Sequence, residues 1–116
     1  MSFHNSEGLG EEELACIEAC TECRDRCTEL VEEGLGRGAK PGDWALGLLL
    51  QDCAEVCVVT ANFVFRRSAR SREARLWCAR LCLEAAGELG GKGQAGGREC
   101  TETLLRCAKQ CWTAYR

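Results

Sequence analysis

The sequence has little of several residue types that β-sheet proteins and hydrolases use. Its 116 residues include one proline and one histidine, and aromatic side chains make up 6%. β-branched residues are also few, which argues against a sheet because strands are enriched in them. A single histidine leaves no plausible base to activate a cysteine nucleophile. We therefore expect neither a β fold nor a hydrolase of the cysteine–histidine type.

Features of nucleotide and nucleic-acid binding are also missing. The formal net charge is -3, so the composition does not indicate nucleic acid as a partner. The glycines of residues 87–97 are not followed by the lysine and serine or threonine that end a phosphate-binding loop. No other catalytic constellation is visible, and we expect a protein that is not an enzyme.

Long apolar runs are absent as well. The longest apolar stretch, WALGLLL at 44–50, is much shorter than the roughly 18 residues that would suggest a membrane span. The N-terminus, MSFHNSEGLGEEE, has neither the basic nor the apolar region of a secretory signal. We therefore expect no membrane association and a cytoplasmic, reducing location in which cysteines stay as thiols.

The residues that are abundant favour helices. Runs of Ala, Leu, Glu and Arg are typical of helices. The chain is divided by glycine-rich breaks at 32–43 and 87–97 and by a polar break at 66–73. This pattern predicts one all-α domain over residues 1–116, an antiparallel up-down-up-down four-helix bundle. The expected helices span residues 11–33, 43–67, 71–88 and 98–115.

Cysteine is the residue type in excess, at 11 of 116 residues. The odd count rules out complete internal disulfide pairing. Each predicted helix carries cysteines four residues apart, so the chain repeats a cysteine-bearing helix. The pairs are Cys16/Cys20, Cys23/Cys27, Cys53/Cys57, Cys78/Cys82 and Cys107/Cys111, and Cys100 stands outside them.

The first helix shows what this spacing means. Residues 16–27 read CIEACTECRDRC, with cysteines at offsets 0, 4, 7 and 11. Residues so spaced share one face over three turns, and the residues between them are largely charged. The cysteine face is therefore expected to be buried, and thiols would line the bundle axis. Counting about 1.5 Å per residue from the loops places Cys20, Cys57, Cys82 and Cys107 near one level.

The residues alone leave several interpretations of these thiols open. Buried cysteine can pack as a small hydrophobe, and disulfides between helices are geometrically possible. Metal binding is favoured because alanine or leucine would pack as well without the risk of oxidation. Thiolates are soft ligands that select Cu(I), zinc or iron–sulfur clusters, and 11 thiols exceed the need of one zinc site. Eleven thiols could bind several Cu(I) ions per chain or, alternatively, one [4Fe–4S] cluster for electron transfer.

The sequence resembles the cysteine-rich four-helix-bundle copper storage proteins of bacteria. The resemblance covers nearly the whole chain and rests on CIEACTECRDRC, LLLQDCAEVC, LWCARLC and RCAKQC, one in each predicted helix. It implies storage or buffering of several Cu(I) ions by cysteine thiolates inside the bundle, a homo-oligomer that is commonly a tetramer, and a cytosolic location. The implied copper ligands are Cys16, Cys20, Cys23, Cys27, Cys53, Cys57, Cys78, Cys82, Cys100, Cys107 and Cys111.

Some positions depart from this family pattern. Ala85 and Leu89 stand in the third helix where the resemblance leads us to expect further thiols. In the fourth helix Thr103 is expected on the cysteine face between Cys100 and Cys107. Part of the interior would then be filled by residues that cannot bind metal, which implies a lower copper capacity.

Arginines cluster around the second break of the chain. We interpret them as a solvated loop and helix face that balances the acidic first helix, although a docking patch for an acidic partner is the functional alternative. The cluster comprises Arg66, Arg67, Arg70, Arg72, Arg75 and Arg80.

Overall fold

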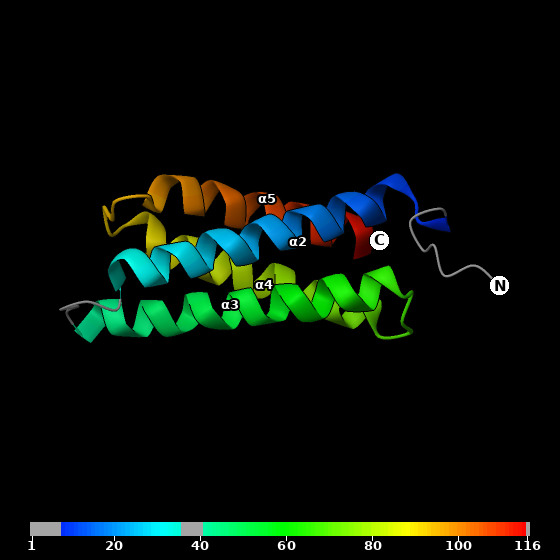
Figure 1. Ribbon diagram of the computed structural model, residues 1–116, viewed down its shortest axis with the longest axis horizontal. Helices are drawn as coiled ribbons and strands as arrows, with labels where there is room; N and C mark the ends of the chain where they lie inside the picture. Colours follow the sequence, from blue (N-terminus) through cyan, green and yellow to red (C-terminus); the bar gives the residue numbers. More distant parts are fainter. Residues whose placement is uncertain (1–7, 36–40, 116) are drawn as a thin grey trace.

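The computed structural model describes residues 8–35 and 41–115. Its four long helices are α2 (Glu11–Leu30), α3 (Pro41–Phe65), α4 (Ser71–Gly90) and α5 (Gly97–Tyr115), and the π-helical segment η1 (Val31–Leu35) follows α2. Successive helices run in opposite directions (Figure 1). The predicted all-α, up-down-up-down four-helix bundle is therefore confirmed, and every predicted helix end lies within three residues of the observed one.

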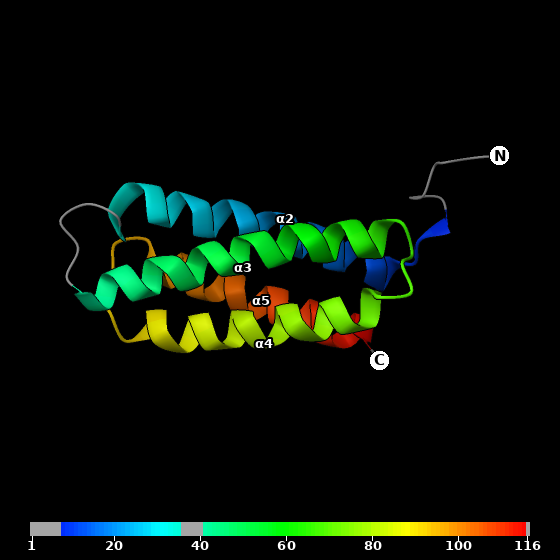
Figure 2. The same cartoon turned by 90° about the horizontal axis from the view of Figure 1, so that it is seen from below.

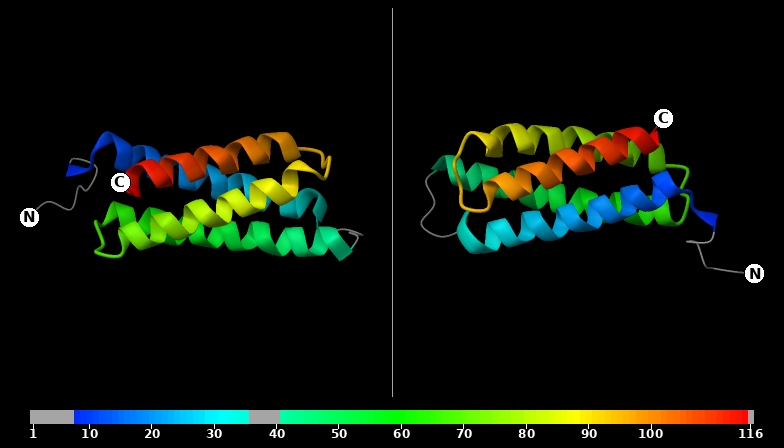
Figure 3. Two further views of the ribbon diagram at one scale, coloured as in Figure 1. Left: turned by 180° about the vertical axis from the view of Figure 1, so that it is seen from behind. Right: turned by 90° about the horizontal axis from the view of Figure 1, so that it is seen from above.

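The helices form a bundle in which sequence neighbours are neighbours in space. Helix α2 packs against α3 and α5, and α4 packs against the same two helices. The connection at 66–70 lies at one end of the bundle, which we call the α3–α4 end, together with the start of α2 and the end of α5 (Figure 2). The connection at 91–96 lies at the opposite, α4–α5 end (Figure 3).

Each helix turns a face that contains cysteines towards the interior. In α2, charged side chains such as Glu18, Glu22 and Asp25 are exposed, and the opposite face is buried. This face follows the three-to-four-residue spacing of an amphipathic helix. Its buried members are Cys16, Ala19, Cys20, Cys23, Cys27 and Leu30.

The large aromatic side chains lie outside this core. Trp44, Trp77 and Trp112 are each more than half exposed, at 61%, 55% and 52%. Within the described residues, the buried core cluster contains cysteine, alanine, leucine and valine but no aromatic side chain. Small side chains bury less apolar surface than leucine or phenylalanine, so each contributes less to folding.

The two ends of the interior differ in polarity. At the α4–α5 end the core is closed by buried leucines, Leu30, Leu46, Leu50, Leu89 and Leu104. The α3–α4 end contains buried polar groups instead. There the Thr60 hydroxyl donates to the carbonyl of Ala74 at 3.2 Å, and the Ser71 hydroxyl donates to the carbonyl of Phe63 at 3.0 Å.

Helix α3 is the most apolar of the four. By length and composition alone, its segment Trp44–Phe65 could cross a membrane. The sequence shows no uninterrupted apolar run of that length, because Asp52 and Glu55 lie within this segment. In the bundle, one side of this helix supplies buried residues such as Leu50 and Cys53 to the shared core. A core helix of a bundle meets the same test of length and composition.

Candidate metal centre

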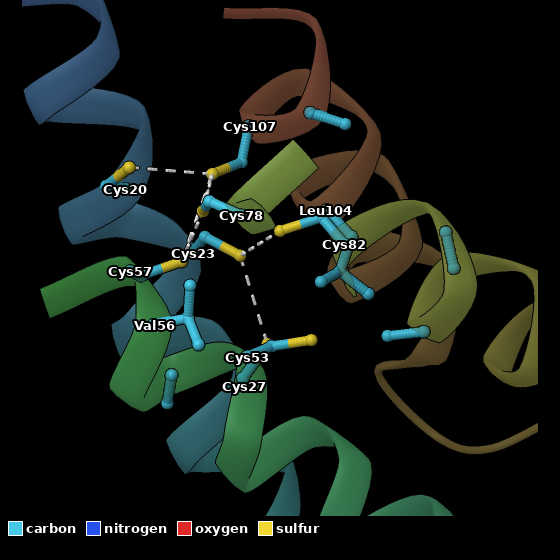
Figure 4. Packing of buried hydrophobic residues seen from close by; sticks show 14 of the residues in the cluster. Cys20, Cys23, Cys27, Cys53, Val56, Cys57, Cys78, Cys82, Leu104 and Cys107 are labelled. Atoms are coloured by element: carbon cyan, nitrogen blue, oxygen red, sulfur yellow. Dashed lines mark hydrogen bonds between the residues drawn. The ribbon is translucent and has the colours of Figure 1, made fainter. Parts of the chain in front are cut away.

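All 11 cysteines are buried and free. They come from all four helices and belong to one buried core cluster, and Figure 4 shows the cysteines in the middle of this cluster. We call this set the sulfur column. From the α3–α4 end towards the α4–α5 end, it runs from Cys16 and Cys111 to Cys27 and Cys100. The inward orientation predicted for the cysteine faces is therefore observed.

The middle of the sulfur column contains two groups of four thiols that share members. In each group all four sulfur atoms lie within 4.8 Å of one another. Cys57 and Cys107 belong to both groups, and their sulfur atoms are 3.9 Å apart. The groups are Cys20, Cys57, Cys78 and Cys107, and Cys23, Cys57, Cys82 and Cys107.

A third group and further contacts extend the sulfur column in both directions. At the α3–α4 end, Cys111 lies 3.7 Å from both Cys16 and Cys20, measured between sulfur atoms, and these three form a three-thiol group. On the other side, Cys27 lies 4.0 Å from both Cys23 and Cys100. The sulfur atoms thus follow one another along the bundle at nearly constant spacing.

Cys53 is placed differently from the other thiols. Its sulfur atom lies 3.5 Å from the carbonyl oxygen of Leu81 and donates a hydrogen bond to it. Among the described residues, it belongs to none of the groups of three or more potential ligands.

These spacings suit single metal ions held between sulfur atoms. A metal–sulfur distance of about 2.3 Å puts the sulfur atoms of a tetrahedral site about 3.8 Å apart, and those of a trigonal site about 4.0 Å apart. The Cys57–Cys78 and Cys78–Cys107 distances are 3.8 and 4.0 Å. Coordination would therefore require little movement of the helices.

The levels of two cysteines on α4 differ from the prediction. Cys20, Cys57 and Cys107 do share a level, but Cys78 completes their four-thiol group, and Cys82 belongs to the next group. The reason is that α3 ends at Phe65, two residues earlier than expected. Measured from the α3–α4 connection, Cys57 then lies closer to the level of Cys78 than to that of Cys82, one turn further along α4.

Hydrogen bonds between thiols move their pKa values in opposite directions. Hydrogen bonds with Cys111 and Cys20 lower the pKa of Cys16 to about 4, although burial raises it. Hydrogen bonds with Cys107 and Cys16 raise the pKa of Cys111 far above its usual range. The pKa of Cys57 is likewise raised, by hydrogen bonds with Cys107 and Cys20 and by burial. The metal-free column therefore retains protons that a metal must displace.

The α4–α5 end of the interior contains residues that cannot bind metal. Ala85 and Leu89 are buried in the core, as the departures from the family pattern predicted. On α5, Thr103 is buried between Cys100 and Cys107, as predicted, and Leu104 beside it is fully buried as well (Figure 4). The Thr103 hydroxyl donates its hydrogen to the carbonyl of Glu99 at 2.9 Å.

One arginine of the predicted solvated cluster lies inside the bundle. Arg75 is only 7% exposed, whereas Arg66, Arg67, Arg70, Arg72 and Arg80 are exposed. The prediction of a solvated face was therefore wrong for Arg75. A signal was present in the sequence, because Arg75 precedes Cys78 by three residues and hence shares its helix face.

A cavity also reaches the sulfur column from the side. It has a volume of about 230 Å³ and lies between α2 and α3. Cys20 and Cys57 are among its lining residues, together with the polar side chains of Thr21, Arg24 and Asn62. Two members of the four-thiol groups thus border a hollow between two neighbouring helices.

Comparison with protein families gives a match over nearly the whole chain. The sequence model of the family described as copper storage protein matches residues 7–116. A relative described as the uncharacterized cysteine-rich protein YhjQ of Bacillus subtilis (strain 168) is 26% identical over 97 residues. That alignment covers 84% of this chain and 90% of the relative.

Solved structures with the same fold are also known. The Cu(I)-bound copper storage protein BsCsp3 superimposes with a TM-score of 0.84 at 24% sequence identity. The superposition covers 91% of this chain and all of that one. The Nmul_A1745 protein from Nitrosospira multiformis gives a TM-score of 0.80 at 26% sequence identity. This superposition covers 89% of this chain and 94% of that one.

Proposed function

Because the chain belongs to the copper storage protein family, we propose that it stores or buffers several Cu(I) ions in the sulfur column. The observation that carries this proposal is the pair of four-thiol groups that share Cys57 and Cys107 and lie beside a three-thiol group. Soft thiolates favour Cu(I), and shared thiolates can bridge neighbouring ions. All 11 cysteines are proposed as ligands, with Cys53 at the edge of the set because its thiol is turned towards Leu81.

The iron–sulfur alternative has no support from the comparisons. The geometry is also unfavourable for a [4Fe–4S] cluster, in which each of four irons carries one thiolate on the outside of the cube. Four sulfur atoms within 4.8 Å of one another leave space between them for one ion rather than for such a cube. We therefore retain Cu(I) as the proposed cargo.

The proposed role is storage rather than catalysis, in a reducing compartment. Family membership supports a storage protein, and the 11 free thiols need reducing conditions to remain ligands. For these reasons we propose the cytoplasm as the location. Copper bound in the buried column would be kept away from water and from other cellular thiols.

We also propose that the protein is a homo-oligomer, a tetramer by family resemblance. Support comes from large apolar side chains that the single chain leaves exposed, including Leu48 and Val59 on α3 and Trp77 on α4. Exposed apolar side chains of this size are typical of surfaces that contact other proteins. Size-exclusion chromatography with light scattering is expected to give a mass of about four chains, and a monomer at micromolar concentration would contradict this proposal.

Proton release provides a test of thiolate coordination. Thiols such as Cys57 and Cys111 have raised pKa values and keep their protons near neutral pH. Each Cu(I) ion should therefore displace about one to two protons. Because fewer protons compete as pH rises, the apparent affinity should increase from about pH 6 to pH 8. Titration of Cu(I) into weakly buffered protein with a pH indicator measures the release, and uptake without proton release would contradict thiolate binding.

A further inference from the structure

The cavity between α2 and α3 borders the four-thiol groups from the side of the bundle. The two helices lie side by side (Figure 1), and the cavity has a volume of about 230 Å³. Its lining includes one cysteine from each helix, Cys20 and Cys57. Three other cavities, next to Leu89, Gln51 and Trp77, have no cysteine among their lining residues. Open space and candidate metal ligands thus meet between α2 and α3.

The two thiols at this cavity are placed to receive one ion together. Cys20 and Cys57 belong to the same four-thiol group, so their sulfur atoms lie within 4.8 Å of each other. Two sulfur atoms on opposite sides of one ion are about 4.6 Å apart at a metal–sulfur distance of about 2.3 Å. Cys57 also belongs to the second four-thiol group. An ion received between these two residues can therefore pass to both groups without leaving sulfur ligands.

Partly buried side chains control access from the cavity to these thiols. Cys20 and Cys57 are both 0% exposed. Ile17 precedes Cys20 by three residues and Ala61 follows Cys57 by four, so each lies beside its cysteine on the helix surface. Both line the cavity, and both pack against the core. A larger side chain in place of Ala61 would narrow the cavity, and a smaller one in place of Ile17 would widen it.

The lining of the cavity suits a small thiol that carries Cu(I). Soft sulfur ligands exchange Cu(I) directly when the incoming sulfur atom can approach the ion before the donor leaves. A volume of about 230 Å³ is many times the roughly 10–15 Å³ that one water molecule needs. The cavity therefore has room for the sulfur-bearing end of a donor as well as for the ion.

Polar side chains at the same cavity can bind the rest of such a donor. Thr21, Arg24 and Asn62 are exposed and belong to the lining. Their hydrogen-bonding groups match the carboxylate and amide groups of a thiol derived from amino acids. Arg24 is paired with Asp25 through its Nε and Nη2 atoms, and a guanidinium has five N–H donors in all.

The two ends of the bundle are the other routes to the sulfur column. Buried leucines close the α4–α5 end. At the α3–α4 end, the hydroxyls of Thr60 and Ser71 are engaged with backbone carbonyls. An ion that entered there would meet Cys16 and Cys111 first. Entry along the bundle axis from the α3–α4 end is therefore the competing explanation.

We propose that the cavity between α2 and α3 is a lateral port at which Cys20 and Cys57 take Cu(I) from a small thiol complex. The inference rests on Cu(I) storage as the function and adds the place of exchange and the class of donor. In the exchange, two bonds from copper to donor sulfur atoms are replaced by bonds to Cys20 and Cys57. The two thiol protons pass to the released donor sulfur atoms, and copper remains Cu(I) throughout.

Two substitutions change the width of the port in opposite directions. Ala61→Leu is expected to slow the uptake of Cu(I) from its complex with glutathione by about 10-fold or more, because it narrows the port. Ile17→Ala should make the same uptake faster. Neither residue is a proposed ligand, so the final capacity should equal that of the unaltered protein. Anaerobic stopped-flow measurement of copper–sulfur absorption gives the rate, and titration against a competing chelator gives the capacity.

Ala15→Leu and Leu49→Ala are the matched controls for these two substitutions. Ala15 on α2 and Leu49 on α3 are also half-buried, but neither lines the cavity. Both controls should load at the rate of the unaltered protein. They separate a change in the width of the port from a general change in packing.

Uptake at the unaltered rate by both Ala61→Leu and Ile17→Ala would overturn the inference and indicate entry at the α3–α4 end, while the proposed function stands. If Ala61→Leu fails to fold or loses capacity, Ile17→Ala decides, and the absence of faster uptake then contradicts the port. An unaltered protein that takes up no Cu(I), from the glutathione complex or in the titration, would contradict the proposed function, and this inference would fail with it.

Discussion

Replacing Cys57 and Cys107 together by alanine is expected to remove more than half of the Cu(I) capacity. These two residues belong to both four-thiol groups, so the double variant leaves only two thiols in each group. The Cys107 sulfur atom is also within 4.0 Å of those of Cys20, Cys57 and Cys78. Anaerobic titration of the variant with Cu(I), with a chelator present, measures the remaining capacity.

The matched control is the variant with Cys53 and Cys100 replaced by alanine. It loses the same number of buried thiols, but neither residue belongs to a group of three or more potential ligands among the described residues. We expect it to lose clearly less capacity. Equal losses in the two variants would show that the thiols act independently of their grouping. Circular dichroism of both metal-free variants verifies that the helices remain folded.

Copper loading is expected to raise the melting temperature by more than about 20 °C. The metal-free core of the described residues contains many thiols and alanines and no aromatic side chain. An ion present at about 1,000 times its dissociation constant stabilises the folded state by about 4 kcal/mol. One kcal/mol corresponds to about 4 °C for a domain of this size, so several ions together give a large shift. Calorimetry of the metal-free and Cu(I)-loaded protein measures it.

This stabilisation should depend on the shared thiols and should be reversible. The variant without Cys57 and Cys107 is expected to gain much less stability from Cu(I) than the unaltered protein. Removal of Cu(I) by an excess of a strong chelator should restore the original melting temperature. A loaded protein that melts within a few degrees of the metal-free form would contradict a buried site, because ions bound only at the surface or to unfolded chains stabilise the fold little.

The fold and the inward-facing thiols were predictable from local sequence patterns. The spacing of Cys16, Cys20, Cys23 and Cys27 fixes one helix face, and the charged residues between them indicate which face is buried. Glycine-rich and polar breaks mark the helix ends because such residues disfavour the helix interior. These signals act within a few residues, so one sequence is sufficient to read them.

The pairing of thiols across helices was less predictable. It depends on where each helix begins and ends. Because α3 was predicted to end two residues too late, the prediction placed Cys57 at the level of Cys82, whereas the structure groups it with Cys78. Which of two adjacent buried residues on α5, Thr103 or Leu104, lies deeper in the interior depends in the same way on the rotation of the helix. Arg75 was misread because charged residues are rarely buried, although its position three residues before Cys78 placed it on the buried face of α4.

The most direct test of the account is the metal content of the protein after anaerobic titration with Cu(I) against a competing chelator. The account predicts tight binding of several Cu(I) ions per chain, in a protein without iron or sulfide. About four iron and four sulfide per purified chain, with little further uptake of copper, would contradict it and indicate an iron–sulfur protein instead.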